Sequence, residues 1–105
     1  MEIEYKIERS KTYIYFVGEL DECSSANARV KVDKIIENTK VGNCVLFDFS
    51  KTTFMDSTGI GVLLGRYKKM KKLGIKGYVS SPSFQVDKIL QISGIYDVMP
   101  KYIRG

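Results

Sequence analysis

The feature that most constrains this chain is the short, almost wholly apolar run at residues 44–49 (CVLFDF), which is soon followed by a helical pattern. Such a run is typical of a central β-strand that is covered on both faces. A chain of 105 residues can bury one core of ordinary size. The run therefore predicts an α/β domain with this strand near the middle of its sheet.

Strand and helix patterns alternate around this run. Residues 2–8 alternate between charged and apolar side chains, which predicts a strand with one buried face, and the β-branched and aromatic residues 12–17 predict its hairpin partner. Apolar residues recur at helical spacing in three further segments, and two more have a weaker strand pattern. The expected helices lie at about 25–38, 57–73 and 83–93, and the expected short strands lie at 75–80 and 96–99.

Small residues mark the expected ends of these helices. Ser24 or Ser25 is a suitable N-cap for the first helix, and the segment Ser81-Pro82-Ser83 offers capping residues for the third. Gly74 and Gly94 are natural stops for the second and third. The resulting order β-β-α-β-α-β-α-β predicts one α/β domain over residues 1–105, with a small mixed β-sheet that combines an N-terminal antiparallel hairpin with parallel crossovers.

Charge and composition narrow the class of protein. The net charge is +5, and the basic excess lies mainly in residues 66–72 (RYKKMKK), which we interpret as a solvated helix face. Aromatic residues do not alternate with these lysines, so direct nucleic-acid binding is not expected. No apolar run reaches the length of a membrane span, and the first residues do not form a signal peptide. The sequence therefore predicts a cytoplasmic protein that contacts no membrane.

Polar residues follow two of the predicted parallel strands. Asp21 comes after the strand at 12–17, and Asp56 and Ser57 come after the strand at 44–49. Parallel strands end at the same edge of a sheet, which is where open α/β sheets usually bind their ligands. We therefore expect Asp21, Asp56 and Ser57 to be neighbours on one functional edge.

Several catalytic chemistries are excluded by the residue inventory. The chain has no histidine for a Ser-His-Asp triad, too few cysteines for a zinc site, and one DSTG motif where an aspartic protease needs two. Met55 stands where a nucleophile elbow needs its first glycine. The glycines at 59, 61 and 65 lie too far from the strand to form a dinucleotide loop. We therefore expect no catalytic residue, no metal and no cofactor.

What remains is a serine at the start of a helix. Ser57 is expected to cap that helix. A phosphate on Ser57 would also be tolerated there, because helix amides and the dipole favour negative charge. Glycines at 59, 61 and 65 each cost helix stability, about 1 kcal/mol against alanine. Close packing on the sheet would explain them, and so would a partner that approaches the helix backbone.

Three motifs resemble the STAS domain family, and within it the bacterial anti-sigma factor antagonists. They are GELD at 18–21, FMDSTGIGVLLGRYK at 54–68 and ISGIY at 92–96, and the second is the most specific. The resemblance implies a binding protein rather than an enzyme, acting in sporulation-type transcription control. Its partners would be an anti-sigma factor serine kinase with its bound nucleotide, which it would bind to release the sigma factor, and a metal-dependent serine phosphatase.

The resemblance also implies which residues act. The kinase would phosphorylate Ser57, and the phosphorylated form would bind it poorly. The partner-binding positions would be Asp21, Asp56, Ser57, Thr58, Gly59, Ile60, Gly61 and Arg66. Two departures are visible: residues 22–25 (ECSS) replace the usual polar or histidine residues, and residues 101–105 are too few for the usual C-terminal helix, which we therefore do not expect. The alternative is a STAS module of a stress-response or lipid-transport complex.

Overall fold

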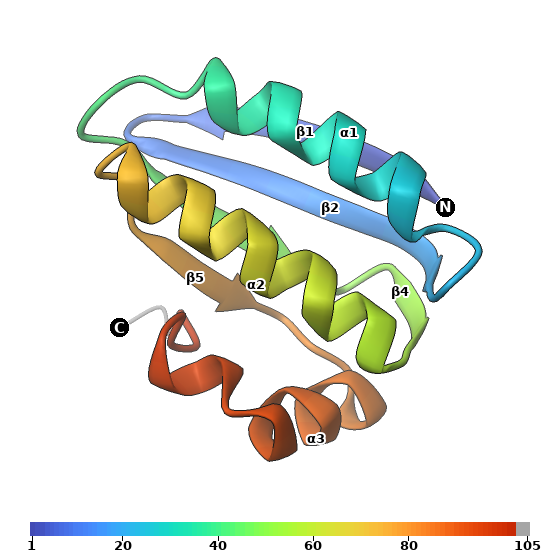
Figure 1. Ribbon diagram of the computed structural model, residues 1–105. Coiled ribbons are helices and arrows are strands. Elements are labelled where there is room, and N and C mark those ends of the chain that lie inside the picture. Colours follow the sequence, from blue (N-terminus) through green and yellow to red (C-terminus); the bar gives the residue numbers. More distant parts are fainter. Residues whose placement is uncertain (103–105) are drawn as a thin grey trace.

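The computed structural model describes residues 1–102, which form a five-stranded sheet, three α-helices and a short 3-10 helix (Figure 1). The sheet order is β1-β2-β3-β5, with β1 antiparallel to β2 and the other pairs parallel. The elements follow one another as β1 (Glu2–Glu8), β2 (Lys11–Leu20), α1 (Ser25–Glu37), β3 (Cys44–Asp48), β4 (Thr52–Met55), α2 (Ser57–Lys72), β5 (Gly77–Ser80), α3 (Phe84–Ser93) and η1 (Ile95–Asp97). The predicted α/β class, with an N-terminal hairpin and parallel crossovers, is confirmed.

The apolar run at residues 44–49 forms β3 and the residues just after it, at the centre of the core. Phe47 and Phe49 are fully buried and lie 5.9 and 5.1 Å from the ring of Phe16, measured between centroids. Helices α1 and α2 lie side by side over one face of the sheet (Figure 1). Leu46 and Asp48 are also buried, on the face opposite these helices. Burial of this strand on both faces is therefore confirmed, although the space beside Asp48 is lined by tyrosine, lysine and serine side chains rather than by a helix.

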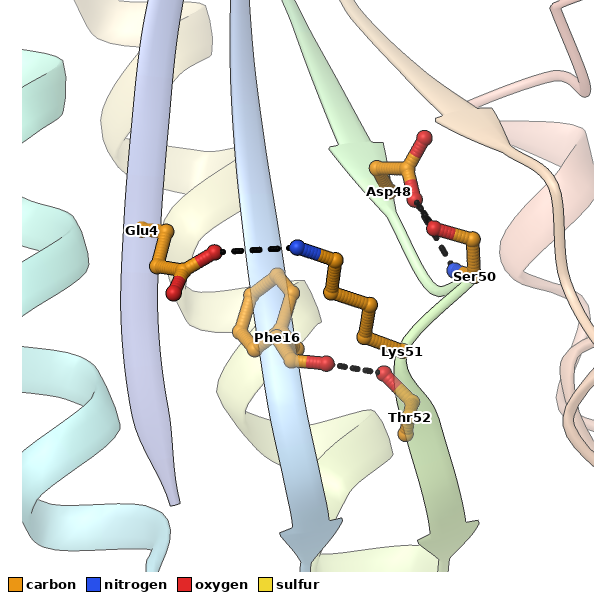
Figure 2. Close-up of polar contacts among 6 residues, drawn as sticks. All are labelled: Glu4, Phe16, Asp48, Ser50, Lys51 and Thr52. Atoms are coloured by element: carbon orange, nitrogen blue, oxygen red, sulfur yellow. Dashed lines mark hydrogen bonds and ion pairs between the residues drawn. The ribbon is translucent and has the colours of Figure 1, made fainter.

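No strand was predicted between the strand at residues 44–49 and the helix at residues 57–73, but residues 52–55 form β4. Asp48 accepts hydrogen bonds from the backbone N–H and the hydroxyl of Ser50, at 2.9 and 2.6 Å, and so turns the chain (Figure 2). Thr52 then donates its hydroxyl proton to the Phe16 carbonyl at 2.6 Å. These contacts return the chain to β2, and β4 pairs with it in parallel at Gly18–Leu20.

The prediction of a strand at residues 96–99 is also wrong, because residues 95–97 form the 3-10 helix η1. Gly94 has a left-handed backbone with φ of 79°, and the Asp97 N–H donates to the Gly94 carbonyl at 3.0 Å, so the chain continues as η1. Strand-like pairing is delayed to Lys101, which forms an isolated parallel bridge with Val79. The lysine also lies 2.9 Å from Asp87. The Tyr96 hydroxyl and Lys101 together lower the pKa of the Asp87 carboxyl.

The predicted helix ends are largely confirmed. The Ser83 hydroxyl accepts from the Val86 N–H at 3.3 Å at the start of α3. Gly94 ends α3, and Gly74, with φ of 72°, follows the end of α2. Ser24 occupies the N-cap position of α1 but makes no capping bond. No helix within residues 1–102 is long and apolar enough to span a membrane.

The predicted buried face of β1 is wrong over most of its length. Ile3 packs partly against the core, but Tyr5 and Ile7 are 58% and 61% exposed. The reason is topological, because β1 is the edge strand and α1 reaches only part of it.

Candidate functional site

The ends of β2 and β4 bring the predicted site residues together. Leu20 of β2 lies opposite Met55 of β4, and the Asp56 N–H points to the Leu20 carbonyl at 3.4 Å. Asp21 and Asp56 each follow directly after a member of this pair, at the ends of the parallel strands β2 and β4. The expected neighbourhood is confirmed, although β4 rather than β3 provides the second strand.

The N-cap of α2 is Asp56, so the expectation that Ser57 caps the helix is wrong. The Asp56 carboxylate accepts from the N–H groups of Thr58 and Gly59 at 2.9 and 3.3 Å. Ser57 is the first helical residue and its side chain is exposed. Within residues 1–102 the Ser57 hydroxyl makes no hydrogen bond. It is therefore free to react with, or bind to, another molecule.

This cap changes the expected surroundings of a phosphate on Ser57. Two of the helix amides that could receive an anion already bind Asp56. A phosphoserine would therefore extend into solvent beside an existing carboxylate, with about 1.5 to 2 added negative charges. The favourable helix dipole still acts at this position. The added negative charge would therefore act mainly on a partner molecule that approaches the N-terminal end of α2.

Asp21 organises the loop between β2 and α1. One of its carboxylate oxygens accepts from the N–H groups of Cys23 and Ser24 at 3.0 and 3.1 Å. The Ser24 hydroxyl donates to the Glu19 carbonyl at 2.8 Å, which explains why it does not cap α1. Met1, Asp21 and Cys23 help to line a polar hollow of about 390 Å³. Asp21 thus holds this loop in shape and remains partly accessible.

The first turns of α2 are held close to the sheet by a glycine. A Cβ atom at Gly59 would lie 2.8 Å from the Met55 side chain and 3.1 Å from the Leu20 carbonyl oxygen. Ile60 is 8% exposed and belongs to the core. A Cβ at Gly61 would meet nothing within 4 Å. Close packing therefore explains Gly59, whereas Gly61 lies exposed on the outer side of the helix.

Arg66 lies apart from the other predicted site residues. It is nine residues, or roughly 14 Å of helix, beyond Ser57. Its side chain is 12% exposed and its Nε lies 2.7 Å from Asp33 Oδ1 on α1. The alignment is poor, so Nε and Nη1 make no hydrogen bond among residues 1–102. Lys69 contacts Asp33 and Glu37 of the same helix. The structure thus places Arg66 between two helices.

A hollow larger than the one beside Asp21 lies away from this site. It has a volume of about 470 Å³ and lies at the opposite end of α2, where Tyr67, Lys71, Tyr78 and Pro100 are among its lining residues. None of the predicted site residues lines it. The candidate site at Ser57 lies at an exposed helix end.

Sequence reasoning missed β4 and the residue that holds it. The Gln85 side chain donates to the Met55 carbonyl at 3.0 Å and accepts from the Met55 N–H at 3.3 Å. It thereby replaces a missing strand neighbour at the outer edge of β4, just before Asp56. The β-branched and aromatic residues of 52–54 (TTF) were a local strand signal. The role of Gln85 had no such signal, because it depends on a contact across 30 residues.

Comparison with known proteins agrees with this geometry. The family model of the STAS domain matches residues 2–103. An anti-sigma F factor antagonist from Paenibacillus polymyxa is 33% identical over 102 residues, which is 97% of this chain and 86% of the relative.

Solved structures of an antagonist named SpoIIAA are similar as well. Its unphosphorylated form aligns with a TM-score of 0.78 and 27% identity, covering 98% of this chain and 90% of the other. The phosphorylated form, described as a Bacillus cell fate determinant, aligns with a TM-score of 0.70 and 25% identity, covering 98% and 93%.

Proposed function

The chain belongs to the STAS domain family, and on that premise we propose that it is an anti-sigma factor antagonist controlled by phosphorylation of Ser57. The unphosphorylated form binds an anti-sigma factor that is also a serine kinase, and the sigma factor is released. The observation that carries this proposal is the exposed, unbonded hydroxyl of Ser57 beside Asp56 at the end of β4. Transcription control of this kind takes place in the cytoplasm.

The partner proteins supply the catalytic groups that add the phosphate to Ser57 and remove it. The sequence has no histidine, and within residues 1–102 no side chain accepts a hydrogen bond from the Ser57 hydroxyl. A kinase supplies both the base and the nucleotide, so this chain needs only to present an accessible hydroxyl. A metal-dependent serine phosphatase returns the protein to its binding form.

Phosphorylation acts on binding because of where the charge is added. The phosphate would lie beside the Asp56 carboxylate, whose own oxygen is committed to capping α2. A partner whose bound nucleotide phosphates or acidic side chains approach this end would meet two neighbouring negative groups. Like charges brought together in an interface cost several kcal/mol. The fold itself gains or loses little, because the dipole favours negative charge at this end.

The proposed contact surface is the outer side of the first turns of α2 together with the Asp21 loop. Ser57, Thr58 and Gly61 are at least partly exposed there, and the absent side chain at Gly61 lets a partner approach the helix backbone. Gly59 and Ile60 support this surface from below. We assign Arg66 an indirect role, which is to fix α2 against α1.

The decisive experiment is to incubate the protein with a purified serine-kinase anti-sigma factor and ATP, then locate the phosphate by mass spectrometry. We expect one phosphate, on Ser57, and none in the Ser57→Ala variant. Thr58→Ser is the matched control, because it keeps a second hydroxyl at the neighbouring position. Phosphate at another residue with Ser57 unmodified would overturn the assignment of the site.

The effect on binding is measured separately by titrating the kinase with each form. We expect the phosphorylated protein to bind at least about 100-fold more weakly, which corresponds to about 2.7 kcal/mol. Its melting temperature should remain close to that of the unmodified protein. Equal affinity of the two forms would contradict the switch, and purification with a transporter ATPase instead of a kinase would favour the alternative STAS function.

A further inference from the structure

The phenylalanines of this chain divide into a buried and an exposed group. Phe54 of β4 and Phe84 of α3 are 42% and 85% exposed. The other three of the five are fully buried in the core, namely Phe16, Phe47 and Phe49. A single exposed apolar side chain is ordinary, whereas several that lie together indicate a binding surface. The meaning of Phe54 and Phe84 therefore depends on where the fold places them.

The fold places the two exposed phenylalanines at the same edge of the molecule. The Gln85 side chain makes hydrogen bonds to both backbone groups of Met55, at 3.0 and 3.3 Å. Phe54 is the residue before Met55, and Phe84 is the residue before Gln85. Figure 1 shows the start of α3 beside β4 and the start of α2. The backbones of both phenylalanines therefore lie close to one contact between segments that are distant in the sequence.

The exposure of Phe84 follows from the register of α3. Val86 and Leu90 are fully buried and define the inner face of this helix. Residues two positions apart on an α-helix point in nearly opposite directions, so Phe84 projects away from the core. The Ser83 hydroxyl accepts from the Val86 N–H at 3.3 Å and so fixes the first turn in this orientation.

The exposure of Phe54 follows from its position on β4. The pair formed by Leu20 and Met55 is fully buried on the side of α2. The preceding pair is Glu19 with Phe54, and both of these side chains are exposed. Because successive side chains of a strand point to opposite faces, Phe54 lies on the face that α1 and α2 leave uncovered.

Both phenylalanines adjoin the candidate site. Ser57 follows Phe54 by three residues and is itself exposed. A protein that binds another typically covers about 20 to 30 of its residues, so a partner that reaches the Ser57 hydroxyl also covers the contact between Met55 and Gln85. Aromatic side chains are enriched in such interfaces, where a few of them provide most of the binding free energy.

We propose that Phe54 and Phe84 form an aromatic patch through which the serine-kinase anti-sigma factor binds this chain beside Ser57. This inference rests on the proposed function, because the kinase that phosphorylates Ser57 is the occupant of the patch. The kinase surface that receives the two rings carries apolar side chains next to its active site. Neither phenylalanine has a polar group to offer to the Ser57 hydroxyl or to the Asp56 cap. The aromatic patch therefore contributes to affinity and selectivity, and the transfer of the phosphate does not depend on it.

Steady-state phosphorylation by the purified kinase tests this proposal, with the concentration of the full chain varied at saturating ATP. Phe84→Ala should raise the KM for this chain about tenfold and leave kcat within about twofold, because the change weakens binding alone. Phe54→Ala should act in the same direction. Ile92→Ala is the matched control and should behave as the wild type. Ile92 is also an exposed apolar residue of α3, but it lies eight residues, or roughly 12 Å, beyond Phe84.

Thermal unfolding of each variant separates a loss of binding from a loss of fold. Because the Phe84 side chain is largely exposed, Phe84→Ala should melt close to the wild type. An equal rise in KM for Phe84→Ala and Ile92→Ala would contradict a patch confined to the start of α3.

The remaining outcomes distinguish this inference from the proposed function. Phosphorylation of Ser57 with an unchanged KM in both phenylalanine variants would overturn the aromatic patch and leave the phosphorylation switch intact. A wild type that the kinase does not phosphorylate on Ser57 would overturn the proposed function itself. Sedimentation velocity of the protein alone tests a second copy as the occupant. The wild type should remain monomeric, and self-association that Phe84→Ala abolishes would assign the patch to a second copy instead of the kinase.

Discussion

At its first turns α2 presents Ser57 and Gly61 to solvent, whereas two to three turns later its Arg66 and Lys69 lie against acidic residues of α1. Both ends belong to one continuous helix of 16 residues. The first end is fixed by backbone contacts with β2 and β4 and leaves its outward groups unused. The second end uses its charged side chains within the fold.

The difference shows how one helix can serve stability and binding at once. A poorly exposed charge that faces an opposite charge inside the chain contributes to folding, whereas an exposed group without an internal partner remains available to another molecule. Arg66 is part of the resembling motif, yet its charge is already paired with Asp33. The first turns of α2 are therefore the better candidate for a switch, and the far end is the better candidate for a structural anchor.

The largest effect should come from filling the close contact at Gly59. Gly59→Val should lower the free energy of unfolding by about 3 kcal/mol, because the added atoms meet the Leu20 carbonyl and the buried Met55 side chain. Gly61→Val is the matched control and should be nearly neutral, since its Cβ meets nothing within 4 Å. Chemical denaturation of both measures the contrast, and equal losses would contradict the packing difference between the two glycines.

Loss of the ion pair between Arg66 of α2 and Asp33 of α1 should have the second largest effect on the free energy of unfolding. Asp33→Ala should cost about 2 kcal/mol, because it leaves the poorly exposed Arg66 guanidinium without its counter-charge. Glu37→Ala removes a more exposed partner of Lys69 and should cost under about 1 kcal/mol. Urea unfolding measures both. An Asp33→Ala variant as stable as the wild type would mean that Arg66 is not an anchor.

Removal of the cap should have a moderate effect. Asp56→Ala leaves the Thr58 and Gly59 N–H groups without their acceptor and should cost about 1 kcal/mol. Asp56→Asn keeps an acceptor oxygen and should restore most of the loss. Thermal unfolding of the three proteins tests the assignment of Asp56 as the cap, which a fully stable alanine variant would contradict.

Gly61→Ala should have the smallest effect on stability, and it should stabilise the protein whereas the changes above destabilise it. Gly61→Ala should stabilise the protein by up to about 1 kcal/mol, because alanine favours a helix and its methyl group meets open space. The same variant should bind the kinase more weakly, since the methyl group obstructs close approach to the helix. Lys72→Ala at the far end is the control for binding. Unchanged affinity of Gly61→Ala would remove this position from the contact surface.

Much of the fold could be predicted from local patterns. The hairpin, the three helices and the stops at Gly74 and Gly94 follow from side-chain period and from residues with special backbone preferences. The neighbourhood of Asp21 and Asp56 followed from the parallel direction of their strands. The failed strand at residues 96–99 had the right composition, but Gly94 and the hydrogen bonds after it favoured η1.

Other features depended on contacts between distant parts of the chain. β4 forms because Asp48, Ser50 and Thr52 return the chain to β2, which a local pattern does not reveal. Gly59 is required because the Leu20 carbonyl lies close to it, whereas Gly61 faces open space. This difference depends on the tertiary structure and has no signal in the local sequence.

By itself, the sequence determined the N-terminal hairpin, the three helices, the edge that brings Asp21 and Ser57 together, and the absence of histidine chemistry from that edge. Only the tertiary structure decided that Asp56 is the cap, that Arg66 faces α1, and that the apolar side of β1 is left open. The physical reason is the range of the interactions. Period and capping preference act within a few residues, whereas burial and ion pairing depend on what the rest of the chain places alongside.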